Sequence, residues 1–151
     1  MRATAAALMI GALIYAVSAQ AASAPDHFTF FGGFQAAAYC DGSGIVPSPQ
    51  TLPAPDFGFA IIGATPSGQA TATVAIRDIP NGYYTVRLIQ GIADCHTIDW
   101  AGFTNAAGTV TIHLSEPAVS STAFIAVDQY ATFDGVPFDI NSSFVTETFR
   151  H

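Results

Sequence analysis

The densest group of potential metal ligands along the chain is Asp94-Cys95-His96, followed closely by Asp99. A copper site in a β-sandwich needs histidines, a cysteine and usually an axial methionine. The two methionines, Met1 and Met9, both lie at the start of the chain, and the four histidines are widely separated. We therefore interpret Asp94 and Asp99 as residues that cap a loop held by a disulfide at Cys95.

Oxygen ligands of the kind that Ca²⁺ prefers occur later in the chain. Asp128, Asp134, Asp139 and Asn141 fall in a segment, 128–141, that we predict to be a loop. Their spacing fits no defined calcium-binding loop, and Asp and Asn are also ordinary turn formers. Calcium bound by Asp128, Asp134 and Asp139 is thus one hypothesis, turn formation is its alternative, and no other cofactor is indicated.

The sequence gives little support to hydrolytic chemistry. A glycosidase needs two carboxylates in one cleft, whereas the two glutamates, Glu116 and Glu147, are far apart. The chain has no G-x-S-x-G nucleophile motif. His113 alternates onto the solvent face of a predicted strand, which is typical of a surface histidine. We expect no catalytic centre, and the alternative is a small extracellular hydrolase that uses His113 or His96 with a neighbouring carboxylate.

Aromatic side chains are the strongest indication of a binding site. Trp100, Tyr130, Phe133 and Phe138 lie in or next to predicted loops, where their ring faces could stack on sugars or apolar ligands. The alternative is that these rings close the ends of the core. We predict a loop-borne binding face for a small molecule, a glycan or a protein surface.

The charge balance excludes several partners. The chain has no lysine, and its four arginines stand against eleven acidic residues, for a net charge of −7. Nucleic acid is an unfavourable partner because phosphate binding needs a cluster of Lys and Arg. Anionic membrane surfaces are disfavoured for the same reason. The high hydrophobic content, 50% of the residues, predicts an ordered domain and not an acidic disordered tail.

The first 24 residues have the organisation of a secretory signal peptide. Arg2 supplies a positive start, Ala5–Val17 is an uncharged apolar run, and small residues follow as two A-x-A patterns, Ala19–Ala21 and Ala22–Ala24. The apolar run is shorter than the ~20 residues that a membrane span needs, so an uncleaved anchor is the less favoured alternative. We predict a secreted protein with a mature domain at 25–151.

The two cysteines, Cys40 and Cys95, both belong to this mature part. An even pair of cysteines in an exported protein usually forms a disulfide. We therefore predict a Cys40–Cys95 bond, with two buried free thiols as the alternative.

The elements that must position these residues are β-strands. Residues 41–56 hold four prolines and two glycines and read as an irregular loop, and Asn81-Gly82 and Asn105–Gly108 read as hairpin turns. Alternation of apolar and polar residues predicts half-buried strands. The predicted strands are Phe28–Phe34, Phe57–Ile62, Thr71–Ile79, Tyr84–Leu88, Ile98–Thr104, Thr109–Leu114, Phe124–Val127 and Phe144–Arg150. Together they predict a single all-β, immunoglobulin-like antiparallel β-sandwich of about 7–8 strands.

One short motif resembles a known corner. The segment Ile79–Val86 (IPNGYYTV) is similar to the L-P-x-G-x-Y-x-V corner of immunoglobulin-like, fibronectin-type and prealbumin-like modules. The resemblance implies that Tyr84 begins a strand, packs inward and bonds through its hydroxyl group to nearby backbone. It implies an architecture and no activity.

Taken together, these features favour a secreted, non-catalytic β-sandwich module that binds through loop aromatics. A structural cell-surface protein that associates with itself through an exposed strand edge is the remaining alternative.

Overall fold

The computed structural model describes residues 24–34, 52–91 and 97–150. Residues 1–23 of the predicted signal peptide lie outside these ranges, as do Cys40 and Cys95, so the export and disulfide predictions remain predictions. All regular elements of the described residues are β-strands. They are β1 (Asp26–Thr29), β2 (Phe31–Phe34), β3 (Leu52–Pro53), β4 (Gly58–Ala64), β5 (Gln69–Arg77), β6 (Tyr83–Ile89), β7 (Trp100–Phe103), β8 (Thr109–Pro117), β9 (Thr122–Phe133), β10 (Val136–Val145) and β11 (Phe149–Arg150).

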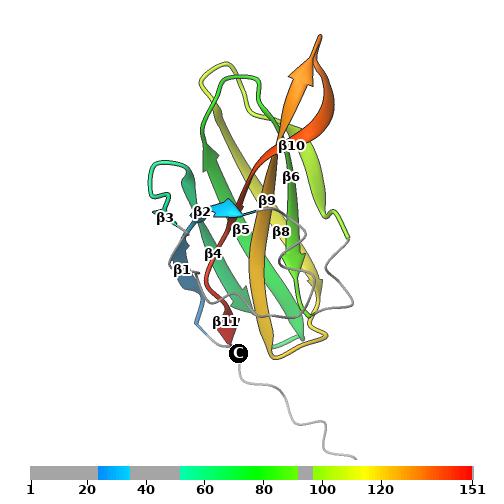
Figure 1. The fold of residues 1–151 in the computed structure, drawn as a ribbon. Helices are drawn as coiled ribbons and strands as arrows, with labels where there is room; N and C mark the ends of the chain where they lie inside the picture. The colour runs from blue at the N-terminus through cyan, green and yellow to red at the C-terminus, as the bar shows by residue number, and fades with distance from the viewer. Residues whose placement is uncertain (1–23, 35–51, 92–96, 151) are drawn as a thin grey trace, which may run out of the picture.

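The strands form two antiparallel sheets that pack face to face (Figure 1). The smaller sheet has the order β1-β4-β5-β8, and the larger has the order β3-β2-β10-β9-β6-β7. β11 continues beyond β10 along the same neighbour, because Phe149 pairs with Ala123 of β9. The chain is therefore an all-β sandwich, as the alternating sequence predicts.

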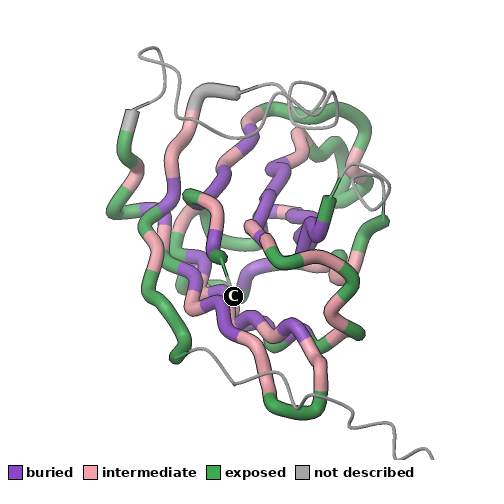
Figure 2. The backbone as a smooth tube through the Cα atoms, turned by 90° about the horizontal axis from the view of Figure 1, so that it is seen from below, coloured by how far each residue is buried: buried purple, intermediate pink, exposed green. Residues whose placement is uncertain are grey.

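The core lies between the sheets and takes side chains from both of them. In β5 the burial alternates strictly, with Ala72, Val74 and Ile76 buried and Thr73 and Ala75 between them on the outer face. Phe57 stacks on Phe144, with ring centroids 3.6 Å apart and an interplanar angle of 8°. Figure 2 shows that the buried positions lie along the strands, whereas exposed positions occur both in the connections and along the strands. The two sheets are thus held together by one apolar layer to which both contribute side chains.

The outer face of the larger sheet departs from the predicted solvent-exposed face. Thr85 and Arg87 alternate with the core residues of β6, yet they are only 3% and 8% exposed. Arg87 forms an ion pair with Asp128 of the neighbouring strand β9, and the Ser143 hydroxyl donates to the other oxygen of that carboxylate at 2.6 Å. A buried charge is tolerated only when it is paired and hydrogen-bonded, so this face depends on cross-strand polar contacts.

The two predicted hairpin turns are crossings between sheets. β5 belongs to the smaller sheet and β6 to the larger, so the Asn81-Gly82 turn joins the two layers, and Asn105–Gly108 joins β7 to β8 in the same way. Asn81 does adopt a positive φ of 54°, as an Asn-Gly turn requires. The hairpin interpretation was wrong because a local turn signal does not indicate which sheet receives the next strand.

The corner residues hold the two crossings together. The Thr104 hydroxyl donates to the carbonyl oxygen of Ile79 at 2.6 Å and accepts from the Gly82 N–H at 2.9 Å. Tyr84 is fully buried at the start of β6, and its hydroxyl donates to a carboxylate oxygen of Asp78 at 2.7 Å. The predicted inward tyrosine is therefore present, and its hydroxyl has the Asp78 side chain as a partner in addition to the backbone of Ile79.

The largest correction concerns 128–141, which we expected to be a loop. These residues form most of a long hairpin in which β9 and β10 pair from Val136–Phe133 to Val145–Ala126. Its connection is the two-residue turn Asp134-Gly135, with φ values of 50° and 77°. Asp-Gly accepts positive φ at both central positions, the geometry that a tight hairpin requires. The predicted Phe28–Phe34 strand is likewise two strands, which pair in different sheets.

Candidate binding surface

The β9–β10 hairpin extends beyond the strands that flank it, as Figure 1 shows. β6 pairs with β9 only from Phe124 to Tyr130, and β2 pairs with β10 only from Ser143 to Val145. In the part of the chain that the structure describes, the outer end of the hairpin has no strand on either edge. It therefore presents both its side chains and its backbone edges.

Large apolar side chains occupy this outer end. Phe133, Val136 and Phe138 are 72%, 64% and 66% exposed, and with Asp134 they line a shallow apolar hollow. Single exposed apolar residues are common on protein surfaces, but a contiguous group of them usually marks an interaction site. We name this group, Phe133, Val136 and Phe138, the hairpin tip.

The strand geometry explains why these three side chains meet. Val136 pairs directly with Phe133, so the two share one face of the hairpin. The register then shifts between Pro137 and Asp139, which leaves Phe138 as an extra residue in β10. A β-bulge of this kind redirects side chains and increases the local twist. The bulge therefore leaves Phe138 beside Phe133 and Val136 and not in an ordinary cross-strand pair.

The tip carries acidic residues and lies next to a row of aromatic rings. Asp134 in the turn and Asp139 in β10 are both exposed. Tyr130 lies below the tip, and its ring contacts Tyr83 at 5.6 Å between centroids. Tyr83 in turn contacts Phe103 at 5.0 Å. These three rings line the outer face of the larger sheet across β9, β6 and β7. Phe133 follows Tyr130 by three residues in β9, so it points to the opposite face of the hairpin.

Trp100 does not belong to this surface. It lies in β7 and not in a loop, is half-buried and packs against the main core. It pairs with Val86, whose side chain points inward, whereas Tyr83 and Tyr130 point outward. Of the four predicted binding aromatics, the structure brings Phe133 and Phe138 together, places Tyr130 on the opposite face of the hairpin and separates Trp100.

The predicted calcium ligands are also separated. Asp128 is 1% exposed and is engaged by Arg87 and Ser143, whereas Asp134 and Asp139 are exposed on the hairpin. One oxygen of Asp139 accepts from the N–H of Ile140 at 2.8 Å. Within the described residues, no group of three His, Cys, Asp or Glu side chains is placed to hold a metal ion.

The histidine of the hydrolase alternative has a hydroxyl partner. His113 is exposed on the outer face of the smaller sheet, and its Nδ1 lies 3.1 Å from the Thr73 hydroxyl oxygen. His96 lies outside the described residues.

Sequence reasoning missed Val136 as part of the surface. The available signal was the Asp134-Gly135 pair between apolar segments, which is a strong local indication of a hairpin. The aspartates of this segment also suit metal ligands or loop residues, so the sequence interpretation did not identify the strands on either side of the turn.

Comparison with known proteins does not show a family for this chain. Neither protein-family models, nor curated proteins, nor solved structures gave a match to this chain. Among the described residues, no helix has the length and apolar character that crossing a membrane would require.

Proposed function

We propose that this chain is an exported, non-catalytic binding module that attaches to a protein partner through the hairpin tip. The observation that carries the proposal is the exposure of Phe133, Val136 and Phe138 at the end of a hairpin that extends beyond its sheet. Aromatic anchors that enter a pocket of the partner account for most of the binding energy in many interfaces. Export rests on the signal-like first 24 residues of the sequence.

The scaffold of the proposed module is immunoglobulin-like. Pairing of β5 with β8, of β6 with β9 and of β9 with β10 is the pattern of strands B with E, C with F and F with G in such sandwiches. The Tyr84 corner supports the same assignment, although the match covers few residues. Loops and hairpins at one end of a rigid sandwich are common positions for recognition.

The partner is expected to have an apolar socket with a basic rim. Phe133 and Phe138 supply the apolar contact, and Asp134 and Asp139 supply negative charge beside it. An anionic lipid surface would repel both aspartates, so a protein surface is the better match. Truncation of either phenylalanine to alanine should cost about 2 kcal/mol or more of binding free energy, if these rings are the anchors.

The test uses photo-crosslinking with the mature protein and the extracellular proteins of the producing cell. A photoreactive phenylalanine analogue replaces Phe133 in one sample and Val119 in another, since Val119 is equally exposed but lies away from the hairpin. We expect a discrete crosslinked protein from position 133 only. Excess unlabelled wild type and V119S should compete with the crosslink, whereas F133S/F138S should not.

Two further measurements separate the alternatives. Sedimentation equilibrium of the wild type detects association with a second copy, which the structural-protein alternative requires. Flotation with phosphatidylcholine vesicles detects insertion of the tip into lipid. Crosslinks that form equally from positions 133 and 119, or that F133S/F138S displaces as well as wild type does, contradict the proposal.

A further inference from the structure

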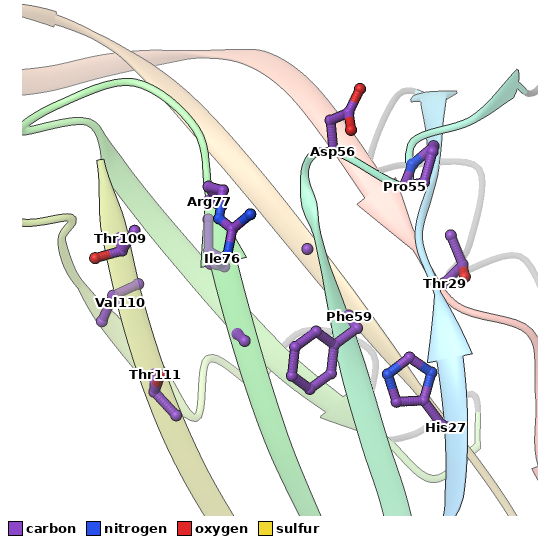
Figure 3. A pocket seen from close by; sticks show the side chains of 12 residues that line it. His27, Thr29, Pro55, Asp56, Phe59, Ile76, Arg77, Thr109, Val110 and Thr111 are labelled. Atoms are coloured by element: carbon purple, nitrogen blue, oxygen red, sulfur yellow. The ribbon is translucent and has the colours of Figure 1, made fainter. Parts of the chain in front are cut away.

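A second hollow lies on the outer face of the smaller sheet, away from the hairpin tip. It has a volume of about 290 Å³, close to the lower end of the range for ligand pockets, about 300–1,000 Å³. Figure 3 shows His27 and Phe59 along one wall, Thr109 and Thr111 along the opposite wall and Arg77 between them at one end. A volume of this size suits a ligand of one or two rings.

Small residues in the sheet create this hollow. Ala75 of β5 pairs with Phe59 on one side and with Thr111 on the other, so a methyl group lies between two larger side chains. β4 begins at Gly58, where φ is 147° and an added Cβ would lie 2.0 Å from the carbonyl oxygen of Ala75. The glycine lets β4 approach β5 closely at the upper end of the hollow and leaves no side chain there.

The aromatic wall is held in place before any ligand binds. The rings of His27 and Phe59 stack, with centroids 4.8 Å apart and an interplanar angle of 23°. Phe59 nevertheless remains 37% exposed. An aromatic ring supported on one face can offer its other surface to the C–H groups of a sugar or another apolar ring.

Arg77 supplies a positive charge that the described part of the protein leaves available. Arg77 is exposed, and no described carboxylate forms an ion pair with it. Its own N–H donates to the carbonyl oxygen of Phe57 at 2.6 Å, which fixes the backbone at the edge of the hollow. In a chain with no lysine and a net charge of −7, few cations are available to pair with an anionic ligand, and Arg77 has no acidic partner among the described residues.

The remaining polar groups are suited to ligand hydroxyls. Thr29, Thr109 and Thr111 line the hollow, and Asp56 lies at its rim. The Thr109 hydroxyl oxygen accepts from the Asn105 side-chain amide at 2.8 Å, which leaves its proton free to be donated. Asp56 can accept from a ligand hydroxyl, but it would repel a doubly charged phosphate. The charge pattern therefore favours a ligand with a single negative charge.

We propose that this hollow binds a sugar ring that carries a carboxylate, as in a uronic acid. The carboxylate pairs with the Arg77 guanidinium, whose planar geometry matches a carboxylate in a two-bond contact. The C–H face of the sugar lies on Phe59, and its hydroxyls bond to Thr109, Thr111 and Asp56. This site is independent of the hairpin tip and does not rest on the function proposed for it.

The experiment is a titration of the isotope-labelled mature protein, followed by two-dimensional amide NMR. The probes are galacturonate and glucuronate oligosaccharides, with a neutral glucose oligosaccharide and a sugar phosphate for comparison. We expect the uronates to shift amide signals of residues 58–59, 75–77 and 109–111 at millimolar concentration. The neutral sugar and the sugar phosphate should bind at least about tenfold more weakly, the equivalent of a lost hydrogen bond to a charged group.

Three variants test the roles of individual side chains. R77Q and F59A should each weaken uronate binding by about tenfold or more. R150Q is the matched control, because Arg150 is exposed in β11, which pairs with β9 of the larger sheet. The spectra of the free variants report whether each one folds. Uronates that cause no shifts at these residues, neutral sugars that bind equally well, or an R77Q variant that binds like wild type would overturn the proposal.

Discussion

At the scale of single residues, Tyr84 shows how one side chain connects the crossing between the sheets to the core. Its ring is fully buried, its hydroxyl donates to Asp78, and the Gln129 side-chain amide donates to both groups, at 2.8 Å to Asp78 and 3.1 Å to Tyr84. Gly82 makes room for the ring, because an added Cβ there would lie 2.8 Å from it. The corner is thus a polar cluster inside an otherwise apolar layer.

This contact has a measurable pH dependence. Burial and the hydrogen bond to Asp78 raise the pKa of Tyr84 well above its ordinary value of 10.0. The folded state therefore holds this proton more tightly than the unfolded state does. Stability from this source is fully present below pH ~10 and is lost as the pH rises above that value.

We predict that Tyr84→Phe lowers the free energy of unfolding by about 1.5–3 kcal/mol at neutral pH, because it removes the donor of a hydrogen bond to a buried carboxylate. The gap between wild type and variant should narrow above pH 10, where only the wild type loses this contribution. Urea unfolding over this pH range measures both effects. Tyr83→Phe is the control and should change stability little. A gap that stays constant with pH would contradict the proposed role of the Tyr84 hydroxyl.

At the scale of elements, the two crossings between the sheets support each other through backbone contacts. The Asp78 N–H donates to the carbonyl oxygen of Gly108 at 2.8 Å, and the Asn81 N–H donates to that of Asn105 at 3.2 Å. Gly108 has a φ of 75°, and an added Cβ would lie 2.1 Å from the Asp78 carbonyl oxygen. The close approach of the crossings therefore depends on this glycine.

Two glycine substitutions separate the requirement for a positive φ from the requirement for space at the crossing. Gly68, in the turn between β4 and β5, has nearly the same φ of 76° but no atom within 4 Å of an added Cβ. Gly68→Ala should cost only the backbone strain of about 1–2 kcal/mol. Gly108→Ala should cost about 3 kcal/mol or more, because strain and steric overlap add. Equal losses in denaturant unfolding would show that the crossings do not need their close contact.

At the scale of the whole molecule, one apolar cluster joins the two sheets. It contains Val74 and Ile112 from the smaller sheet together with Val86 and Val127 from the larger. Neither sheet can keep its inner face buried without the other. A domain of this size whose two sheets share their main core is expected to unfold in one cooperative step.

Trp100 provides the test of this cooperativity. It is the single tryptophan of the chain and packs against the shared core from β7. We predict that tryptophan fluorescence and far-ultraviolet circular dichroism give the same denaturation midpoint, because the first reports on β7 and the second on both sheets. Loss of the Trp100 signal at a lower denaturant concentration would mean that β7 detaches independently.

Much of the fold follows from sequence pattern alone. Period-two alternation in 71–79 and 109–114 located β5 and β8 and the faces that they bury. The corner resemblance correctly placed Tyr84 inside. The sequence pattern failed in 128–141, where three aspartates and an asparagine suggested a loop. The Asp134-Gly135 pair is instead the turn of a hairpin whose strands include most of this segment. The pattern also failed at Phe28–Phe34, where Gly32-Gly33 suggested a bulge or bend within one strand but the chain changes sheet at Phe30.

By itself, the sequence determined the class of fold, the inward faces of most strands, the acidic net charge and two of the three residues of the hairpin tip. These properties are local or additive, so composition and periodicity carry them. Only the tertiary structure decided which turns are hairpins and which are crossings, that Asp128 is buried against Arg87, and that Trp100 faces inward. Only the tertiary structure shows that Phe59, Arg77 and Thr111 line the same hollow. Such contacts depend on strand order and register, which link residues far apart in the chain and leave no mark in any single segment.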